Sequence, residues 1–185
     1  MMKSIDITFI TIETSRLRLR MWRPEDLNDF YEYASVPGVG ELAGWLPHES
    51  IDVSHRILDG FIADRNVFAL DHKENGKVIG SLGLHPSWTA SDPDYSNLHA
   101  VEIGYVLSKE YWGRGLMPEA VQAVIDYLFR NDTLDAITVS HYVHNRQSRR
   151  VIEKCGFTYV KETTRFVRRL EQERPTRHYI LRKPE

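Results

Sequence analysis

The alternation of apolar and polar residues changes period several times along the chain. Residues 16–22 alternate strictly between arginine and apolar side chains until Trp22, which predicts a half-buried strand. After Pro24 the apolar residues recur at helical spacing until Pro37, and a second helical pattern begins after Ser50, a suitable N-cap. The first third of the chain therefore predicts a strand followed by two helices.

Strand periodicity returns in the middle of the chain, where Asn75 and Gly76 join two strand patterns in a strong hairpin signal. Gly156 stands where a glycine commonly ends a helix. The expected strands span residues 67–72, 77–85, 99–107 and 136–143, with helices after residue 115 and over residues 146–155. One or two strands are expected to close the chain.

Length and composition are those of one ordinary globular domain, here taken as residues 1–185. Hydrophobic residues make up 42% and charged residues 27%, with 24 Lys and Arg against 26 Asp and Glu. This balance predicts no nucleic-acid or anionic-membrane partner. The opening residues lack the apolar stretch of a signal peptide, and Cys155 is the single cysteine, so a cytoplasmic location is expected.

A glycine-rich loop over residues 111–117 joins a predicted strand to a predicted helix. Gly113 and Gly115 would let a ligand approach the main chain, where free N–H groups and the helix dipole favour a pyrophosphate, and Arg114 adds a cation. The loop lacks the ending of a P-loop and has Pro118 in place of the third glycine of a dinucleotide fingerprint. The alternative is a tight turn that binds nothing.

Thirty residues later, the sequence N-R-Q-S-R-R-V-I-E-K-C-G-F places Asn145 at a helix start and Ser148 on the inward stripe of that helix. This motif and W-G-R-G-L-M-P-E-A before it resemble, in order, the two cofactor motifs of the GNAT superfamily of N-acetyltransferases. The branch that the chain resembles most is that of the RimJ and RimL ribosomal-protein N-terminal acetyltransferases. The resemblance runs from residue 16 into the late strands.

The resemblance implies an α/β (α+β) fold: a mixed, mostly antiparallel twisted sheet of six or seven strands flanked by about four helices. It also implies acetyl-CoA as co-substrate. Ser148 would protonate the departing thiolate. The residues expected to hold the cofactor are Tyr105, Val106 and Leu107 for the pantetheine arm, Gly113, Arg114, Gly115, Leu116, Met117 and Pro118 for the pyrophosphate, and Asn145 for the pantetheine.

The chain departs from the wider superfamily at Trp112 and Met117. Both positions are expected to act through the main chain, so these side-chain changes should leave cofactor binding intact. A third departure from the superfamily has a chemical consequence. Some members carry a catalytic tyrosine seven residues after the motif asparagine, where this chain has Ile152. A tyrosine mechanism at that position is excluded.

Acetyl transfer requires a neutral amine, which calls for a base near the cofactor. Strand alternation puts Glu102 beside the small residues Ala100 and Gly104, with room for a substrate, and Glu102 is the candidate base, directly or through water. The alternatives are a solvated glutamate and, for Ser148, helix-start hydrogen bonding. Among the remaining candidates, Cys155 is expected in the core, His141 and His144 at a strand end, and no spacing suggests a metal site.

The sequence thus predicts an acetyl-CoA-dependent acetyltransferase acting on a primary amine, with the N-terminal α-amine of a ribosomal protein as one acceptor. A small-molecule acceptor, such as an aminoglycoside, polyamine or metabolite, stays open because it would share every cofactor residue. A non-catalytic CoA-binding module is the alternative from another class. Either a monomer or a homodimer fits.

Overall fold

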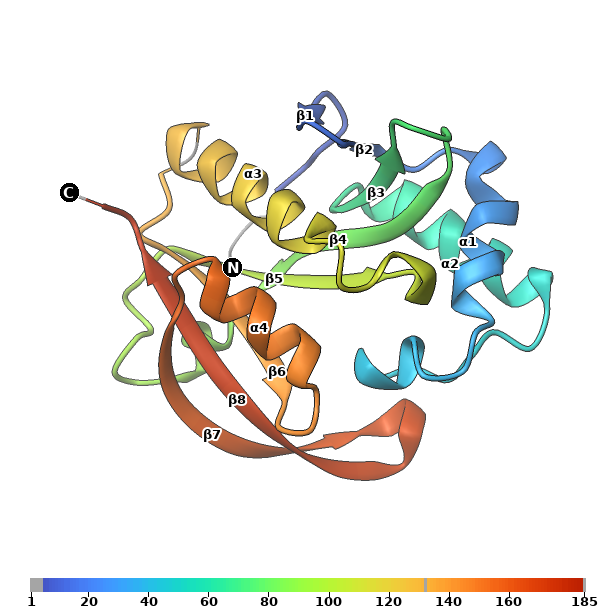
Figure 1. The fold of residues 1–185 in the computed structure, drawn as a ribbon. Helices are drawn as coiled ribbons and strands as arrows, with labels where there is room; N and C mark the ends of the chain where they lie inside the picture. Colours follow the sequence, from blue (N-terminus) through green and yellow to red (C-terminus); the bar gives the residue numbers. More distant parts are fainter. Residues whose placement is uncertain (1–4, 132, 185) are drawn as a thin grey trace.

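The computed structural model describes residues 5–131 and 133–184, which fold around a twisted sheet with helices on both faces (Figure 1). The strand order is β1-β2-β3-β4-β5-β6-β8-β7, and all neighbours are antiparallel except β5 and β6. The strands are β1 (Ile12–Glu13), β2 (Leu17–Met21), β3 (Val67–His72), β4 (Val78–Pro86), β5 (Ala100–Leu107), β6 (Ala136–Tyr142), β7 (Thr158–Val167) and β8 (Gln172–Arg182). The helices are α1 (Leu27–Ala34), α2 (Ile51–Asp64), α3 (Leu116–Asn131) and α4 (Arg146–Lys154).

The order of elements expected from the sequence is confirmed, and so is the mixed, mostly antiparallel sheet. Within the described residues the sheet has eight strands rather than six or seven. The additional strand, β1, pairs with the edge of β2. Because β1 has two residues, it is too short to show a periodicity in the sequence. Gly76 (φ 69°) and Gly156 (φ 80°) adopt the left-handed backbone that glycine accommodates at the hairpin turn and the helix end.

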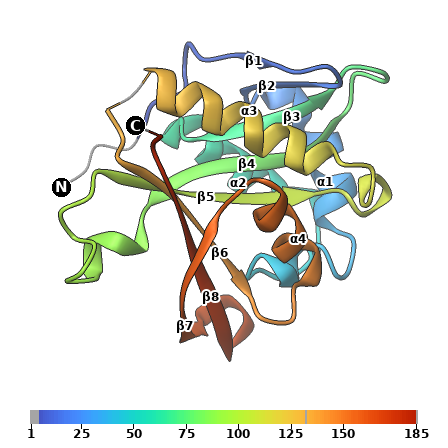
Figure 2. The ribbon, with the colours of Figure 1, turned by 60° about the vertical axis from the view of Figure 1, so that its left-hand side comes forward.

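The two larger apolar cores of the described residues lie on opposite faces of the sheet, and a third, small cluster contains Ala100, Ala136 and Ile180. Buried side chains of α3, together with Ile152 of α4, pack on one face of the sheet, and α1 and α2 cover the other face near β3 and β4 (Figures 1 and 2). Val101 and Ile103 of β5 belong to the core beneath α3, whereas Val106 packs against the core beneath α1 and α2. This alternation confirms the two faces expected for this strand.

The sheet splits between β5 and β6. These strands pair over four positions, from Ala100 with Ala136 to Ile103 with Val139, and then diverge. Residues 104–107 of β5 continue along β4, and residues 140–142 of β6 continue along β8. The β6-facing backbone of residues 104–107 is therefore left without a strand partner. Among the described residues, no helix is long and apolar enough to cross a membrane.

Candidate active site

A cavity of about 630 Å³ occupies the split between β5 and β6. Its walls come from β5, β6, the loop before α3, α4, the end of β4, the segment around the short 3-10 helix η2 (Gly40–Leu42), and one residue each of β7 and β8. Of the twelve residues that the sequence analysis singled out, eleven line it: Glu102, Tyr105, Val106, Leu107, Gly113, Gly115, Leu116, Met117, Pro118, Asn145 and Ser148. The structure thus brings distant sequence motifs into one site.

The loop before α3 has the backbone that a phosphate site requires. Gly113 and Gly115 both have φ 76°, in the left-handed region, where side-chain-bearing residues are strained. A side chain at Gly113 would meet no atom within 4 Å, so the space beside this loop is open. The loop leads into the N-terminus of α3, where backbone N–H groups and the helix dipole attract an anion.

Arg114 is the one expected cofactor residue that does not line the cavity. Its guanidinium lies over the ring of Tyr111, 5.1 Å from the ring centroid. Two of the cations on the cavity wall come from α4, where Arg150 and Lys154 share the lining side of the helix at a spacing of four residues. Helical spacing could have identified this pair, because Gln147 and Val151 line the cavity from the same side.

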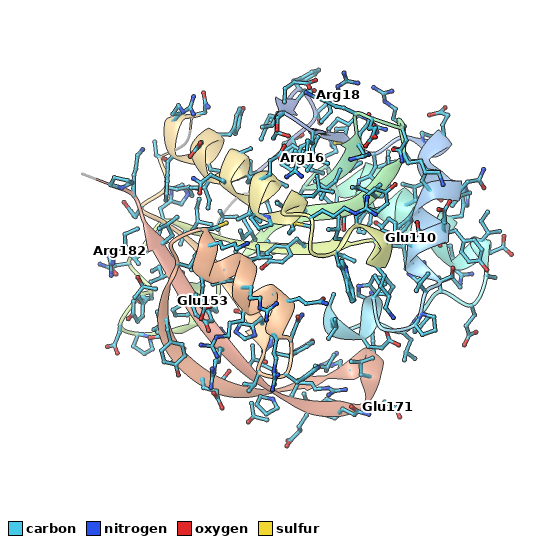
Figure 3. The ribbon with its side chains drawn as sticks, viewed as in Figure 1. Arg16, Arg18, Glu110, Glu153, Glu171 and Arg182 are labelled. Carbon is cyan, nitrogen blue, oxygen red and sulfur yellow. The ribbon has the colours of Figure 1, made fainter. Side chains whose placement is uncertain are left out.

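A clamp between the N-terminal arm and α3 fixes the glycine loop, and the sequence analysis missed it. The Glu119 carboxylate accepts hydrogen bonds from Thr14 Oγ1 (2.6 Å), Ser15 Oγ (3.0 Å) and Arg16 Nε (2.7 Å). Arg16 also donates to the carbonyl of Arg114 (2.9 Å), and Figure 3 shows it between the first strands and the start of α3. Partial burial by itself raises the pKa of Glu119, but these hydrogen bonds outweigh it and lower the pKa to about 2.

Asn145 and Ser148 meet at the start of α4, but their side chains have different partners. Asn145 Oδ1 accepts from the backbone N–H of Ser148 (3.0 Å), which caps the helix, and Asn145 Nδ2 donates to the carbonyl of Leu42 (3.3 Å). Ser148 Oγ does not cap the helix. It lies 3.0 Å from the hydroxyl of Tyr105 on β5, whose pKa is raised by burial. Sequence reasoning gave Tyr105 a backbone role only and missed this pair.

Glu102 lies across β5 from that pair, on the other face of the strand. Its Oε1 accepts from Ser140 Oγ (2.6 Å), and its Oε2 accepts from the backbone N–H of Trp88 (3.3 Å). Burial raises the pKa of Glu102, while Ser140 and the charge of Arg165 act in the opposite direction. A carboxylate whose pKa is raised toward neutrality is a stronger base than a solvated one.

The hydrogen bonds around Glu102 continue into β8 and β7. With Glu102 ionised, the Ser140 hydroxyl donates its hydrogen bond to the carboxylate. Ser140 Oγ can then only accept from His178, so His178 Nδ1 is the donor in their 2.9 Å hydrogen bond. His178 Nε2 then accepts from Thr163 Oγ1 (2.8 Å). Burial and nearby cations lower the pKa of His178 to about 4, so the ring is neutral at pH 7. This relay, which fixes the orientation of Glu102, was not visible from sequence because it spans four strands.

The other histidines differ in their relation to the cavity. His85 is the register partner of Glu102 on β4 and lines the cavity, where desolvation lowers its pKa. His141 lines it too, but its ring nitrogens are engaged by the Tyr142 carbonyl and the Tyr179 hydroxyl. His144 stacks on Tyr142. Burial raises the pKa of Cys155 to about 11, as expected for a thiol in the core. The described residues include no group of acidic, His or Cys side chains arranged to hold a metal ion.

Comparison with known proteins agrees with this geometry. A family model described as an acetyltransferase (GNAT) domain matches residues 16–158. The chain belongs to the GNAT acetyltransferase family. The [ribosomal protein uS5]-alanine N-acetyltransferase of Escherichia coli is 33% identical over 157 residues, 80% of this chain and 78% of that protein. GNAT membership makes the chain an acyltransferase that uses acetyl-CoA.

Solved structures share the GNAT fold at lower identity. The acetyltransferase (GNAT family) of Bacillus anthracis is 20% identical with a TM-score of 0.82, covering 95% of this chain and 100% of that one. The spermidine N-acetyltransferase of Vibrio cholerae, solved with CoA and spermine, is 18% identical with a TM-score of 0.72, covering 92% and 97%. One fold therefore serves both protein and small-molecule acceptors.

Proposed function

We propose that residues 1–185 act as one catalytic domain that transfers the acetyl group of acetyl-CoA to a primary amine, with the N-terminal α-amine of a protein as the acceptor. The observation that carries the proposal is the position of Glu102, a partly buried carboxylate in the wall of the cavity. It lies on β5 next to residues 104–107, whose β6-facing backbone has no strand partner. The cofactor arm would lie along that backbone as an added strand. The amine would then approach from the side of Glu102.

Each step of the transfer has a candidate group in the cavity. Glu102 takes a proton from the amine, directly or through water, so that the nitrogen attacks the thioester carbonyl. A backbone N–H of β5 steadies the oxyanion while the new C–N bond forms. The C–S bond then breaks, and Ser148 donates its hydroxyl proton to the departing sulfur. Tyr105, in contact with Ser148 Oγ, can return a proton to it.

The pKa of the acceptor favours an α-amine. An α-amino group has a pKa near ~7.7 to 8.0, so roughly a tenth is neutral at pH 7, whereas a lysine amine near ~10.4 is neutral in well under a thousandth. A single carboxylate base suffices more readily for the first. The similarity to the uS5-alanine acetyltransferase supports the same acceptor class.

The test compares peptides with a free N-terminus and the same peptides blocked at the N-terminus but carrying one lysine. We expect a higher kcat/KM for the free N-termini. Equal values, or activity on aminoglycosides or polyamines alone, would reject the N-terminal acceptor and favour the small-molecule alternative. A protein that binds acetyl-CoA but releases no thiol with any amine would be a CoA-binding module without activity.

A further inference from the structure

Two arginines of the β7–β8 hairpin, neither of which the sequence analysis singled out, lie at or beside the cavity wall on the side of Glu102, which we call the acceptor end. Arg165 of β7 and Arg174 of β8 are register partners, so their side chains leave the hairpin on the same face. Arg165 lines the cavity. Nε of Arg174 is buried and, within residues 5–131 and 133–184, has no hydrogen-bond partner. The pair therefore places two cations side by side, with N–H donors that are free to bind a ligand.

Like charges directly opposite each other destabilise a strand pair, so such a pair needs a counter-charge. Among the described residues neither guanidinium takes part in a salt bridge, although the charge of Arg165 acts on the Glu102 carboxylate. Two acids of the hairpin lie elsewhere. Glu162 pairs with Arg177 at 3.0 Å on the opposite face, and Glu171 lies at the turn (Figure 3). The two guanidinium groups are therefore left without a direct ion-pair partner in the described part of the chain.

The pair lies on the same sheet face as the candidate base. Thr163, two residues before Arg165 on β7, bonds to His178, which bonds to Ser140 and so to Glu102. Two residues along a strand span roughly 7 Å, so Arg165 lies a few bond lengths beyond the relay. Its charge reaches the base, because it is one of the causes that lower the pKa of Glu102 against the effect of burial.

The opposite wall completes an enclosure. Val39, Leu42 and Ala43, around η2, line the cavity, and a side chain at Gly44 would meet Tyr142 and Val167 of the hairpin side. Figure 1 shows this segment facing the turn between β7 and β8. The acceptor end is thus bounded by an apolar wall on one side and by cationic strands on the other.

The charges of several arginines reach the histidines around this end of the cavity. Desolvation is the largest cause that lowers the pKa of His48 and of His144. The charge of Arg169 lowers the pKa of His48 further, and the charge of Arg174 does the same for His144. Arg165 acts in the same direction on His178, after desolvation and Lys161. A polycationic acceptor would be repelled here, and an acceptor with an anionic group would be attracted.

We infer that the acceptor carries a carboxylate or phosphate a few bonds from its amine, and that Arg165 and Arg174 bind this group while Glu102 faces the amine. The inference rests on the proposed function, since it describes the acceptor of the same reaction. Guanidinium groups suit this task because their planar donors match the oxygens of carboxylates and phosphates.

The experiment measures kcat/KM for acceptors that differ in one charge. One arm uses N-terminal peptides with Glu or Gln as the second residue, and the other compares phosphoethanolamine with ethanolamine. The first arm tests an anion supplied by a protein, and the second an anion on a small molecule. We expect a preference of roughly tenfold for the anionic member in at least one arm, and weak or no transfer to spermidine.

Variants connect this preference to the pair. Arg165→Gln and Arg174→Gln should each remove most of the roughly tenfold preference, and the loss should appear as a higher KM for the anionic acceptor. Arg165→Lys should keep part of it. Arg177→Gln is the matched control, because it removes the same charge from the other face of β8. The melting temperature of Arg165→Gln without ligands should be unchanged or higher, since a repulsive pair is relieved.

Several outcomes would overturn the inference. Equal kcat/KM for the charged and neutral acceptors in both arms, or an equal loss in Arg177→Gln, would show that the arginines are only a solvated face of the hairpin. Efficient transfer to spermidine would point to the opposite charge preference. Absence of transfer to every amine would reject the proposed function itself. A measurable charge preference that does not depend on Arg165 would overturn the inference about the arginines but would leave the proposed function standing.

Discussion

At the scale of single residues, the proposed chemistry depends on how Glu102 is held. Ser140 donates a 2.6 Å hydrogen bond to its carboxylate, and the relay through His178 keeps Ser140 oriented. Burial raises the pKa of Glu102, and the Ser140 hydrogen bond limits the rise because it stabilises the charged form. The carboxylate is therefore more basic than a solvated one.

Glu102→Gln should lower kcat/KM by about 10² to 10⁴, because a positioned base typically contributes that much. The loss should be largest at pH values above the pKa of Glu102 and below that of the amine, where the base is ionised and few amines are neutral without help. Ser140→Ala should keep activity at high pH but move the acidic limb of the pH profile upward, since removing the hydrogen bond raises the pKa of Glu102 further. Profiles of kcat/KM against pH measure both effects. A loss in Glu102→Gln that is independent of pH would instead mean that Glu102 positions the acceptor.

The contact between Ser148 and Tyr105 makes a second prediction at this scale. Ser148→Ala should lower kcat by about 10² to 10⁴ while leaving acetyl-CoA affinity within a few-fold, because a proton donor acts in the transition state. Tyr105→Phe tests whether its hydroxyl, 3.0 Å from Ser148 Oγ, supports the donor. Stopped-flow turnover and calorimetric titration separate the two quantities. Should Tyr105→Phe alone reproduce the whole loss, the donor is the tyrosine.

At the scale of elements, the Glu119 carboxylate joins α3 to the arm before β2. The folded pKa of Glu119, about 2, lies below its ordinary value. This stabilisation is therefore complete above a pH of about 4.5 and is lost as the pH falls toward 2. At pH 7, Glu119→Gln should reduce the free energy of unfolding by about 2 kcal/mol, because its charged hydrogen bonds are lost.

Denaturant melts at several pH values test this expectation. The difference between the native protein and Glu119→Gln should shrink as the pH falls below about 4.5 and vanish near 2. Glu153→Gln is the control, since Glu153 makes an exposed pair with Arg149 on α4 and should change stability by no more than about 0.5 kcal/mol. A constant difference across pH would show that Glu119 acts through packing instead of charge.

Comparing the helices, strands and loops with the sequence shows which of these features could be predicted. The helices, the long strands and the glycine loop were predicted because each has its own periodicity or glycine signal, and eleven of the twelve expected catalytic and cofactor residues line one cavity. The clamp of Arg16 on Glu119 and the relay from Glu102 to Thr163 were not predicted. These contacts join residues far apart in the chain, and no local pattern records which strands become neighbours. The charge of Arg114 was visible in the sequence, but the direction of its side chain over the Tyr111 ring was not.

At the scale of the whole molecule, the split sheet divides the structure into two parts that a ligand can join. On one side stand β1 to β5 and the start of α3, and on the other stand β6 to β8, with α4 packed on β6 (Figure 2). They pair through four positions of β5 and β6. A cofactor arm along residues 104–107 would pair with β5 and contact α4 across the split. Binding should therefore stabilise the molecule as a whole.

Acetyl-CoA should raise the melting temperature, and the size of the effect follows from mass action. At a hundred times the dissociation constant the stabilisation is ~2.7 kcal/mol, which corresponds to about 5 to 10 °C for a chain of this length. ATP at the same concentration should give a much smaller shift, because it lacks the pantetheine arm. Gly115→Glu should abolish the shift, since a side chain at φ 76° strains the loop and its charge repels the pyrophosphate. The shift, not the absolute melting temperature, is compared, because the strain lowers stability with or without ligand. Equal shifts from ATP and acetyl-CoA would contradict the placement of the pantetheine arm between β5 and β6.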